Sequence, residues 1–182
     1  MSLHFQSLVL LKSNDQSRLK YMAELELEET FSIKPPRSSG LAGTKIFMAI
    51  GALIGEQHSF MHDLESFFWV LFWICIHYDG RDEKGRVKRR IVPKYERWNY
   101  ADTEELADLK TGLVVEEDRF KKTTAGFTLC CQPLAPCVRD LRRYIFPGGK
   151  HWLGENRELC SQIKAVLDRA RKDLELRATE LC

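Results

Sequence analysis

The stretch HDLESFFWVLFWICIHY, residues 62–78, decides how the rest of this chain can fold. Ten consecutive residues within it, 67–76, carry no formal charge and are mostly large and apolar. A helix formed by them is apolar on every side, so other parts of the molecule must enclose it. A membrane span needs about 20 apolar residues, whereas a run of about 10–14 is typical of a core helix. We therefore expect residues 63–78 to form the buried central helix of a mainly α domain.

Composition limits the class of protein. The chain has 182 residues, 44% of them hydrophobic and 30% charged, which is typical of one ordered domain with a sizeable core. The formal net charge of +2 gives no indication of nucleic-acid binding, and no stretch has the length of a membrane span. The first residues, MSLHFQSLVLLKSN, contain no basic leader and no small-residue cleavage site. We therefore expect an intracellular protein, cytoplasmic or nuclear, of undetermined oligomeric state.

The six cysteines form no Cys-x-x-Cys pair. In a reducing compartment, cysteines of this kind are usually small apolar residues, so we assign them neither a disulfide nor a metal role. They are Cys75, Cys130, Cys131, Cys137, Cys160 and Cys182.

Residues 1–41 differ in character from the rest of the chain. Residues 8–11 are strand-like, and residues 18–22 could form the second arm of a small β-hairpin. The Pro35-Pro36 pair follows, in a segment that cannot sustain a helix and is expected to be exposed coil. We therefore divide the chain into this N-terminal segment and a helical domain over residues 42–182.

Two segments follow the central helix. Residues 79–94, DGRDEKGRVKRRIVPK, are expected to be a polar excursion, because they are too charged to pack. Asp102 with Glu105 three residues later is typical of a capping box, which would open a short helix through Lys110.

Two more helices are predicted towards the C-terminus. Either Pro133 or Pro136 can stand in the first turn of a helix that Pro147 and the two glycines after it would end. Residues 156–178 show the clearest amphipathic pattern, with apolar residues three or four apart. The apolar stripe consists of Leu159, Ile163, Val166, Leu167, Ala170 and Leu174.

Several motifs follow one another in a fixed order, and together they resemble a known family. GTKIFMAI, residues 43–50, resembles the end of a protein-kinase activation segment. HDLESFFWVLFWIC, residues 62–75, resembles the buried central helix of a kinase C-lobe. ERWNYADTEELADLKTG (96–112) and PLAPCVRDLRRYIFPGGKHW (133–152) are similar to the fungal-type protein kinase family in particular. The resemblance covers roughly residues 24–174.

The resemblance implies a kinase C-lobe-like helical subdomain around one buried central helix. In the parent family, the activity is ATP-dependent phosphoryl transfer to Ser or Thr of proteins. The resemblance also makes Gly43, Thr44, Met48 and Ala49 residues of an activation-segment or substrate loop. It makes Asp63 the structural carboxylate that begins the central helix and receives backbone N–H groups of a catalytic loop.

The motifs for phosphoryl transfer do not accompany this resemblance. A kinase needs a Gly-rich loop over ATP, a strand Lys paired with a helix Glu, a catalytic Asp and a metal-binding Asp. The sequence has no Gly-x-Gly-x-x-Gly and no His-Arg-Asp, and the family register places Arg18 where a carboxylate should hold magnesium. We therefore expect a truncated kinase domain that is inert alone, with no catalytic, cofactor-binding or metal residue assigned. ATP and Mg are expected only for the complete parent domain.

Two other functions remain as alternatives. A pseudokinase-like helical module would bind a protein partner through C-lobe surface, exposed around Met48 and Phe60 where an ATP-binding lobe is missing. A split kinase would instead be completed by another polypeptide. A partner-dependent gain of ATP binding would indicate the split kinase, whereas a specific partner without a nucleotide effect would favour the module.

One departure from the family changes an expected ion pair. The family places a Glu after Met-Ala-x, and that Glu pairs with an Arg of the later helices, but Gly51 stands here. This would leave Arg139, Arg142 or Arg143 without its partner. Loss of one member of a buried pair costs about 3–5 kcal/mol unless the survivor reaches solvent.

Other residues have both a functional and a plain structural interpretation. His58 and His62 are four residues apart and could suggest a metal, but a loop with no second ligand pair is the preferred interpretation. Ser38 and Ser39 are candidate phosphorylation sites, as opposed to a plain linker. Residues 84–90, KGRVKRR, could bind an import receptor or an acidic partner, but a solvated charged loop is the default.

Overall fold

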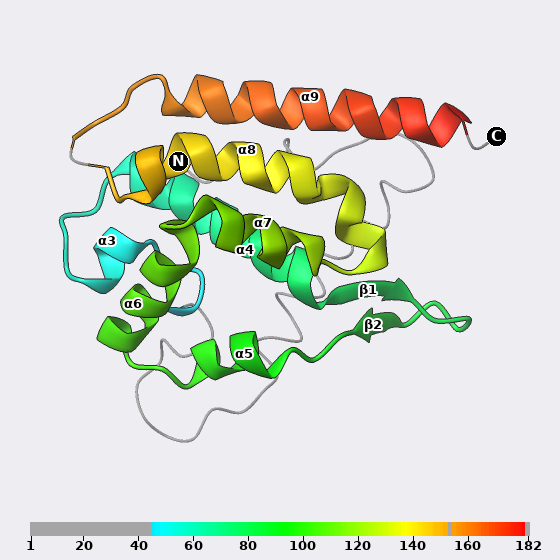
Figure 1. Cartoon of the computed structure of the whole chain (residues 1–182), viewed down its shortest axis with the longest axis horizontal. Helices are drawn as coiled ribbons and strands as arrows, with labels where there is room; N and C mark the ends of the chain where they lie inside the picture. Colours follow the sequence, from blue (N-terminus) through cyan, green and yellow to red (C-terminus); the bar gives the residue numbers. More distant parts are fainter. Residues whose placement is uncertain (1–44, 153, 181–182) are drawn as a thin grey trace. The chain divides into compact units, whose positions relative to one another are not determined.

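The computed structural model of this chain describes residues 45–152 and 154–180. Within these residues the architecture is mainly helical, with one two-stranded antiparallel hairpin (Figure 1), which confirms the expected fold class. The elements, with η marking a 3-10 helix, are α3 (Ile50–Leu53), α4 (Phe60–His77), β1 (Tyr78–Arg81), β2 (Val87–Arg89), α5 (Pro93–Glu96), η2 (Arg97–Asn99), α6 (Thr103–Val114), α7 (Glu117–Ala125), η3 (Leu129–Leu134), α8 (Ala135–Ile145), η4 (Pro147–Gly149) and α9 (Leu159–Glu180).

Several predicted features lie outside the described residues, and each of them remains a prediction. They are the candidate N-terminal hairpin, the division of the chain after residue 41, and the roles of Arg18, Ser38, Ser39, Gly43 and Thr44.

Helix α4 is the central helix expected from the sequence, and it begins three residues earlier than residue 63. Ser59 is its N-cap, and the Ser59 backbone N–H donates to Nδ1 of His62 at 3.0 Å. Asp63 places a negative charge in the first turn, where the helix dipole favours it. The helix ends because Tyr78 adopts an extended backbone and continues into β1. In the view of Figure 1, α4 lies behind α7 and α8, which cover it.

Aromatic side chains form the buried face of α4. Phe68, Trp69 and Phe72 are each no more than 1% exposed. The ring centroid of Phe68 lies 5.4 Å from that of Phe146, at the end of α8, and 6.1 Å from that of Phe120 in α7. Aromatic pairs at such distances add about 0.5–1.5 kcal/mol beyond the burial of their area. Helices α7 and α8 therefore pack on α4 through one aromatic cluster.

Residues 78–89 form a hairpin, which the sequence analysis did not predict, while none of residues 79–94 is buried, as expected of a polar excursion. The register pairs Tyr78 with Arg89 and Arg81 with Val87. Asp82 holds the turn, because its carboxylate accepts from the backbone N–H groups of Arg86 and Lys84 at 2.9 Å each. These bonds, with a further one from the Arg86 guanidinium, lower the pKa of Asp82. Asp82 and Arg86 thus form an ion pair within the turn.

Other parts of the fold use the last carbonyl groups of α4. The Cys75 carbonyl accepts from the Thr128 N–H at 3.1 Å, and the His77 carbonyl accepts from the Arg90 N–H at 2.7 Å. The Ile76 carbonyl accepts from Nε of Arg90 at 3.1 Å. Carbonyls at a helix C-terminus have no partner within the helix. Here the chain after β2 and the chain before η3 supply their donors.

Helix α6 begins where the sequence predicts and continues four residues past Lys110. Asp102 caps it, since its Oδ1 accepts from the Glu105 backbone N–H at 2.8 Å. The Glu105 carboxylate pairs with Arg97 of η2 instead of completing a capping box. The predicted N-cap is therefore confirmed, while the second half of the box is replaced by a contact to the preceding turn.

Helices α8 and α9 run side by side (Figure 1). Pro136 stands in the first turn of α8, and Pro133 lies in the preceding η3, which resolves the two predicted starting points. Helix α9 begins three residues later than residue 156, and Leu159, Ile163 and Val166 of its apolar stripe are buried. Neither α9 nor another helix of the described residues is both long and apolar enough to cross a membrane.

The cysteines of the described residues fall into two groups, and all are free thiols. Cys75, Cys131 and Cys137 are buried, whereas Cys130 and Cys160 are exposed. The first group therefore fits the interpretation of cysteine as a small apolar residue.

Candidate functional site

Two of the predicted substrate-loop residues, Met48 and Ala49, lie directly before α3. Ala49 is the N-cap of α3 and is fully buried, and Met48 is half-buried. The Met48 carbonyl accepts a hydrogen bond from Nζ of Lys110 in α6. The end of the predicted substrate loop is therefore anchored in the core by α6.

Asp63 faces solvent in the first turn of α4. Its side chain is 62% exposed, and its Oδ1 lies 3.1 Å from Nε2 of the equally exposed His58. His58 therefore turns towards Asp63, whereas His62 points inward and is buried. The two histidines that are four residues apart in the sequence do not share a partner. The structural role that the family resemblance gives Asp63 remains a prediction.

The buried carboxylate of α4 is Glu65, one turn into the helix and fully buried. Its Oε1 accepts from the Ile50 backbone N–H at 2.7 Å and from the Trp69 indole N–H at 2.9 Å. Burial raises the pKa of Glu65, while these two hydrogen bonds act in the opposite direction. Glu65 thus joins α3 to α4, a role that its place in the sequence did not indicate.

Lys110 of α6 is also fully buried, although lysine seldom is. Its Nζ lies 4.6 Å from the ring centroid of Trp69 and 5.8 Å from that of Trp98. Burial lowers the pKa of Lys110 well below its usual value, and the charge of Glu65 partly offsets this. A buried acid and a buried base therefore face the same indole ring.

A second carboxylate, Glu56, is positioned by the turn that ends α3. Gly55 has a positive φ of 84°, and the Glu56 N–H donates to the Gly51 carbonyl at 2.9 Å, as in a Schellman motif. The chain therefore changes direction after α3 and folds back over it. The Glu56 side chain is directed back towards Gly51 and the start of α4.

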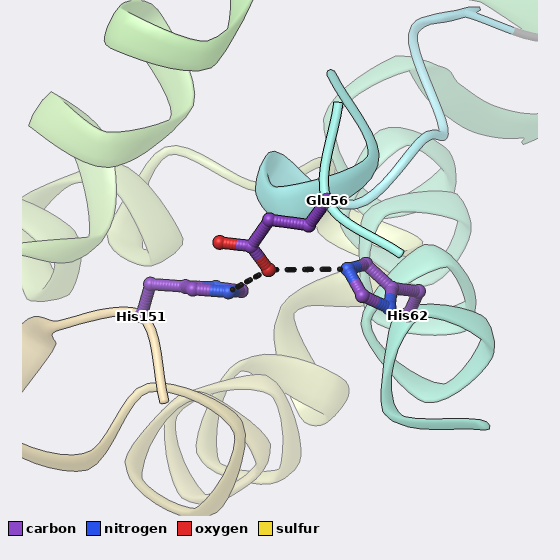
Figure 2. Close-up of side chains that lie close together, drawn as sticks. All are labelled: Glu56, His62 and His151. Carbon is purple, nitrogen blue, oxygen red and sulfur yellow. Dashed lines mark hydrogen bonds and ion pairs between the residues drawn. The ribbon is translucent and has the colours of Figure 1, made fainter. Parts of the chain in front are cut away.

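The Glu56 carboxylate lies between two histidines from distant parts of the chain (Figure 2). Its Oε2 is 2.9 Å from Nε2 of His151 and 3.5 Å from Nε2 of His62. Trp152 packs on both imidazoles, with ring centroids 4.0 Å from His151 and 5.4 Å from His62. We call Glu56, His62 and His151 the His–Glu–His cluster. Its groups can hold protons or ligate a cation, and sequence analysis did not bring them together.

Comparison with known proteins finds one family that matches the first part of the chain. Residues 7–75 match the family described as fungal protein kinase. This part of the chain is therefore similar to the fungal protein kinases. No curated protein and no solved structure gives a match.

The match to the fungal protein kinases includes only part of the site. It covers α3, Glu56, His62 and Glu65, and it ends within α4. Lys110 lies in α6 and His151 follows η4, so both lie beyond the matched residues. The similarity to the fungal protein kinases thus covers the segment that carries Glu56, His62 and Glu65, and it does not extend to Lys110 or His151.

Gly51, the departure from the fungal protein kinase pattern, makes room for the His–Glu–His cluster. A Cβ added at Gly51 would lie 2.4 Å from Oε2 of Glu56 and 2.5 Å from Nε2 of His62. Atoms cannot approach so closely, so any side chain at this position would displace both groups. The family resemblance leads us to expect a carboxylate at position 51. Here the residue is glycine, and the carboxylate of Glu56 lies in the space beside it.

Replacing Gly51 with alanine is expected to destabilise the fold by about 1–3 kcal/mol, the usual cost of overpacking. Ordinarily a glycine-to-alanine change inside a helix stabilises by about 0.5–1 kcal/mol. Gly112 of α6 offers the matched control, because the nearest atom to its added Cβ is 3.9 Å away, on the Arg119 side chain. Urea denaturation should show opposite signs for Gly51→Ala and Gly112→Ala. Stabilisation by both would contradict the close approach at Gly51.

Arg142, one of the three arginines considered for the lost ion pair, donates its hydrogen bonds to main-chain carbonyls. Arg142 is 4% exposed, and no carboxylate of the described residues lies within ion-pair distance of it. Its Nε donates to the Val114 carbonyl at 2.9 Å, and its Nη2 donates to the Val115 carbonyl at 3.3 Å. Burial lowers the pKa of Arg142. Carbonyls at the end of α6 therefore replace the carboxylate expected from the family.

The other two candidate arginines have partners on the neighbouring helix α7. Arg143 forms ion pairs with Glu117 and Asp140. Arg139 donates to Oγ1 of Thr124 at 3.1 Å. Arg142 is therefore the one of the three that has no carboxylate partner in the described residues, and main-chain carbonyls accept its hydrogen bonds instead.

Proposed function

We propose that this chain supplies the helical, C-lobe part of a fungal-type protein kinase domain and does not transfer phosphate by itself. The observation that carries the proposal is the family match, which runs from the N-terminal segment through α3 into the buried central helix α4. The later helices contact that helix, as expected of a C-lobe: α8 packs along it, Phe120 of α7 meets Phe68, and Lys110 of α6 lies over Trp69.

The proposed inertness rests on the chemistry of phosphoryl transfer. Positioned phosphate-binding groups and magnesium-binding carboxylates supply nearly all of the catalysis in kinases. The 182-residue sequence carries neither a Gly-rich phosphate loop nor a His-Arg-Asp catalytic motif. Glu65, the buried acid of the described core, is engaged by Ile50 and Trp69. The supporting features thus concern architecture, while none of them provides a nucleotide site.

Thermal unfolding of the purified chain with and without Mg-ATP tests this proposal. A ligand at 100 times its dissociation constant stabilises a protein by about 2.7 kcal/mol. At about 2–4 °C per kcal/mol, that would raise the melting temperature by about 5–10 °C. We expect a cooperative transition that Mg-ATP does not shift relative to Mg²⁺ alone. A shift of several degrees, or phosphorylation of a protein substrate by the chain, would overturn the proposed inertness.

A helical protein-interaction module is the second candidate function. Ile54 and Phe60 flank the loop between α3 and α4, and their side chains are 59% and 38% exposed. Exposed large apolar side chains that gather in one patch are typical of a binding surface, and these two residues are the candidates for such a patch. Such a module would act in the cytoplasm or nucleus through a protein partner. Binding of a purified partner that is weakened by Ile54→Asp and unaffected by ATP would favour this function, whereas partner-dependent ATP binding would indicate a split kinase.

A further inference from the structure

Buried polar atoms without a hydrogen-bond partner gather around the His–Glu–His cluster. Three such side-chain atoms lie here: Nε2 of His62, Nδ1 of His151 and Oε2 of Glu65. An unpartnered buried polar atom costs about 1–3 kcal/mol. A ligand on Nε2 of His62 and Nε2 of His151 would engage the first of these atoms directly and would turn Nδ1 of His151 into a donor that faces Oε2 of Glu65.

We propose that Glu56, His62 and His151 bind one divalent transition-metal ion of the zinc class. The ligand atoms are Oε2 of Glu56 and Nε2 of each histidine, which lie within 4.8 Å of one another. Two imidazoles and one carboxylate are a donor set that zinc accepts with tetrahedral geometry. Three protein ligands leave the fourth position for water or a small anion. Magnesium and calcium prefer sites made of oxygen ligands, so they are not expected to bind here.

The distances between the ligand atoms suit such an ion. Metal–ligand bonds of about 2.0–2.2 Å place neighbouring ligand atoms of a tetrahedron about 3.3 Å apart. The two distances from Glu56 Oε2, 2.9 Å and 3.5 Å, bracket that value. The side chains of His151 and Glu56 are 21% and 40% exposed, whereas that of His62 is 4% exposed. The ion would therefore enter from the solvent side and bind against His62.

The surroundings of His62 allow it to act as a ligand. Nδ1 of His62 lies 2.9 Å from Oγ of Ser59, and a hydroxyl can either donate or accept. Without an ion, Nδ1 accepts from the Ser59 N–H, and the ring proton on Nε2 faces Glu56. With an ion on Nε2, the proton moves to Nδ1 and is donated to Oγ of Ser59. The Ser59 N–H then loses its acceptor, so binding of the ion is expected to weaken the capping box of α4 while the Ser59 hydroxyl holds the ring.

The surroundings of His151 provide the second support. Metal-bound histidines usually direct their other N–H at a carboxylate or carbonyl. Nδ1 of His151 lies 3.9 Å from the unpartnered Oε2 of Glu65, whose other oxygen is held by Ile50 and Trp69. An ion on Nε2 would place the proton of His151 on Nδ1, facing this carboxylate. The buried acid of the core would then orient a ligand of the metal.

The competing arrangement is a bridge without an ion, in which Glu56 accepts a hydrogen bond from each histidine. The two arrangements differ in measurable ways. Binding of a metal displaces the ring proton from Nε2 and is saturable at one ion per chain, whereas the bridge needs no ion. The proposal therefore requires that one Zn²⁺ binds per chain and that substitutions in the His–Glu–His cluster weaken this binding.

The test is a Zn²⁺ titration of the untagged, EDTA-treated full chain by calorimetry, with metal analysis after dialysis. We expect one Zn²⁺ per chain, a rise in melting temperature with Zn²⁺ but not Mg²⁺, and the visible spectrum of a tetrahedral site with Co²⁺. Loss of a supporting group alone costs about 10–100-fold in metal affinity, so Glu56→Gln and His151→Gln should each weaken binding at least that much. Both side chains are partly exposed, so these variants should remain folded, as circular dichroism would verify.

His58→Gln is the matched control, because His58 is exposed, paired with Asp63, and outside the cluster. It should bind Zn²⁺ as the unmodified chain does. The proposal is overturned if the unmodified chain shows no saturable binding. It is equally overturned if Glu56→Gln and His151→Gln bind as tightly as His58→Gln, or if alkylation of the thiols alone abolishes binding, since the ion would then be held elsewhere.

Discussion

Replacing Glu65 with leucine is expected to lower the free energy of unfolding by about 3–5 kcal/mol, the range for removing one member of a buried charged pair. The Ile50 N–H and the Trp69 indole N–H would both lose their acceptor in the core. Lys110 would at the same time lose the negative charge that offsets its burial. Urea denaturation followed by tryptophan fluorescence and circular dichroism would measure the change.

Two control variants separate the causes of this loss. Glu65→Gln keeps an oxygen that can accept both hydrogen bonds and removes only the charge, so it should cost less than Glu65→Leu. Asp63→Asn changes a carboxylate two residues away on the same helix that is 62% exposed and paired with His58. Exposed ion pairs contribute about 0.2–1 kcal/mol, so the loss should stay within that range. A larger loss for Asp63→Asn than for Glu65→Leu would contradict the assignment of Glu65 as the structural carboxylate.

Replacing Phe68 with alanine is expected to destabilise the domain by about 3–5 kcal/mol, the range for a buried Phe-to-Ala change. Phe68 is fully buried, and its ring contacts the rings of Phe120 and Phe146 from α7 and α8. The cavity would lie where three helices meet, and a fold of this kind can close it only in part. At about 2–4 °C per kcal/mol, the melting temperature should fall by roughly 10 °C, as scanning calorimetry can show.

Phe60 provides a control of the same residue type on the same helix. Its side chain is 38% exposed at the first turn of α4, so Phe60→Ala removes little buried area. We expect a loss of less than about 1 kcal/mol. Equal losses at Phe60 and Phe68 would mean that the aromatic cluster is not the centre of the core.

Features set by neighbouring residues could be predicted from the sequence. The central helix follows from an uninterrupted apolar run, α6 from an aspartate N-cap, and α9 from an apolar stripe at helical spacing. The hairpin could not be predicted by the same reasoning. Its strands are short and charged, and the turn depends on the several hydrogen bonds of one carboxylate, Asp82.

The candidate site depends on contacts between residues far apart in the sequence. Glu56 and His151 are 95 residues apart, and Lys110 reaches the Met48 carbonyl across 62 residues. One signal was available: Lys110 stands on the apolar face of α6, three residues after Ala107 and three before Leu113. The pairing of His62 with Glu56 could not be anticipated, since the nearest histidine in the sequence, His58, stacks on the His62 ring with centroids 5.8 Å apart but pairs with Asp63.

The carbonyls at the end of α4 determine how this part of the fold can open. Arg90, which precedes α5, and Thr128, which follows α7, donate hydrogen bonds to the carbonyls of Cys75, Ile76 and His77. The last turn of α4 therefore cannot unwind without breaking the bonds that hold these two segments. Local fluctuations at the helix end are thus converted into a cooperative sub-global event. In amide hydrogen exchange, the Thr128 and Arg90 amides, though outside regular helix, should exchange together with those of the core.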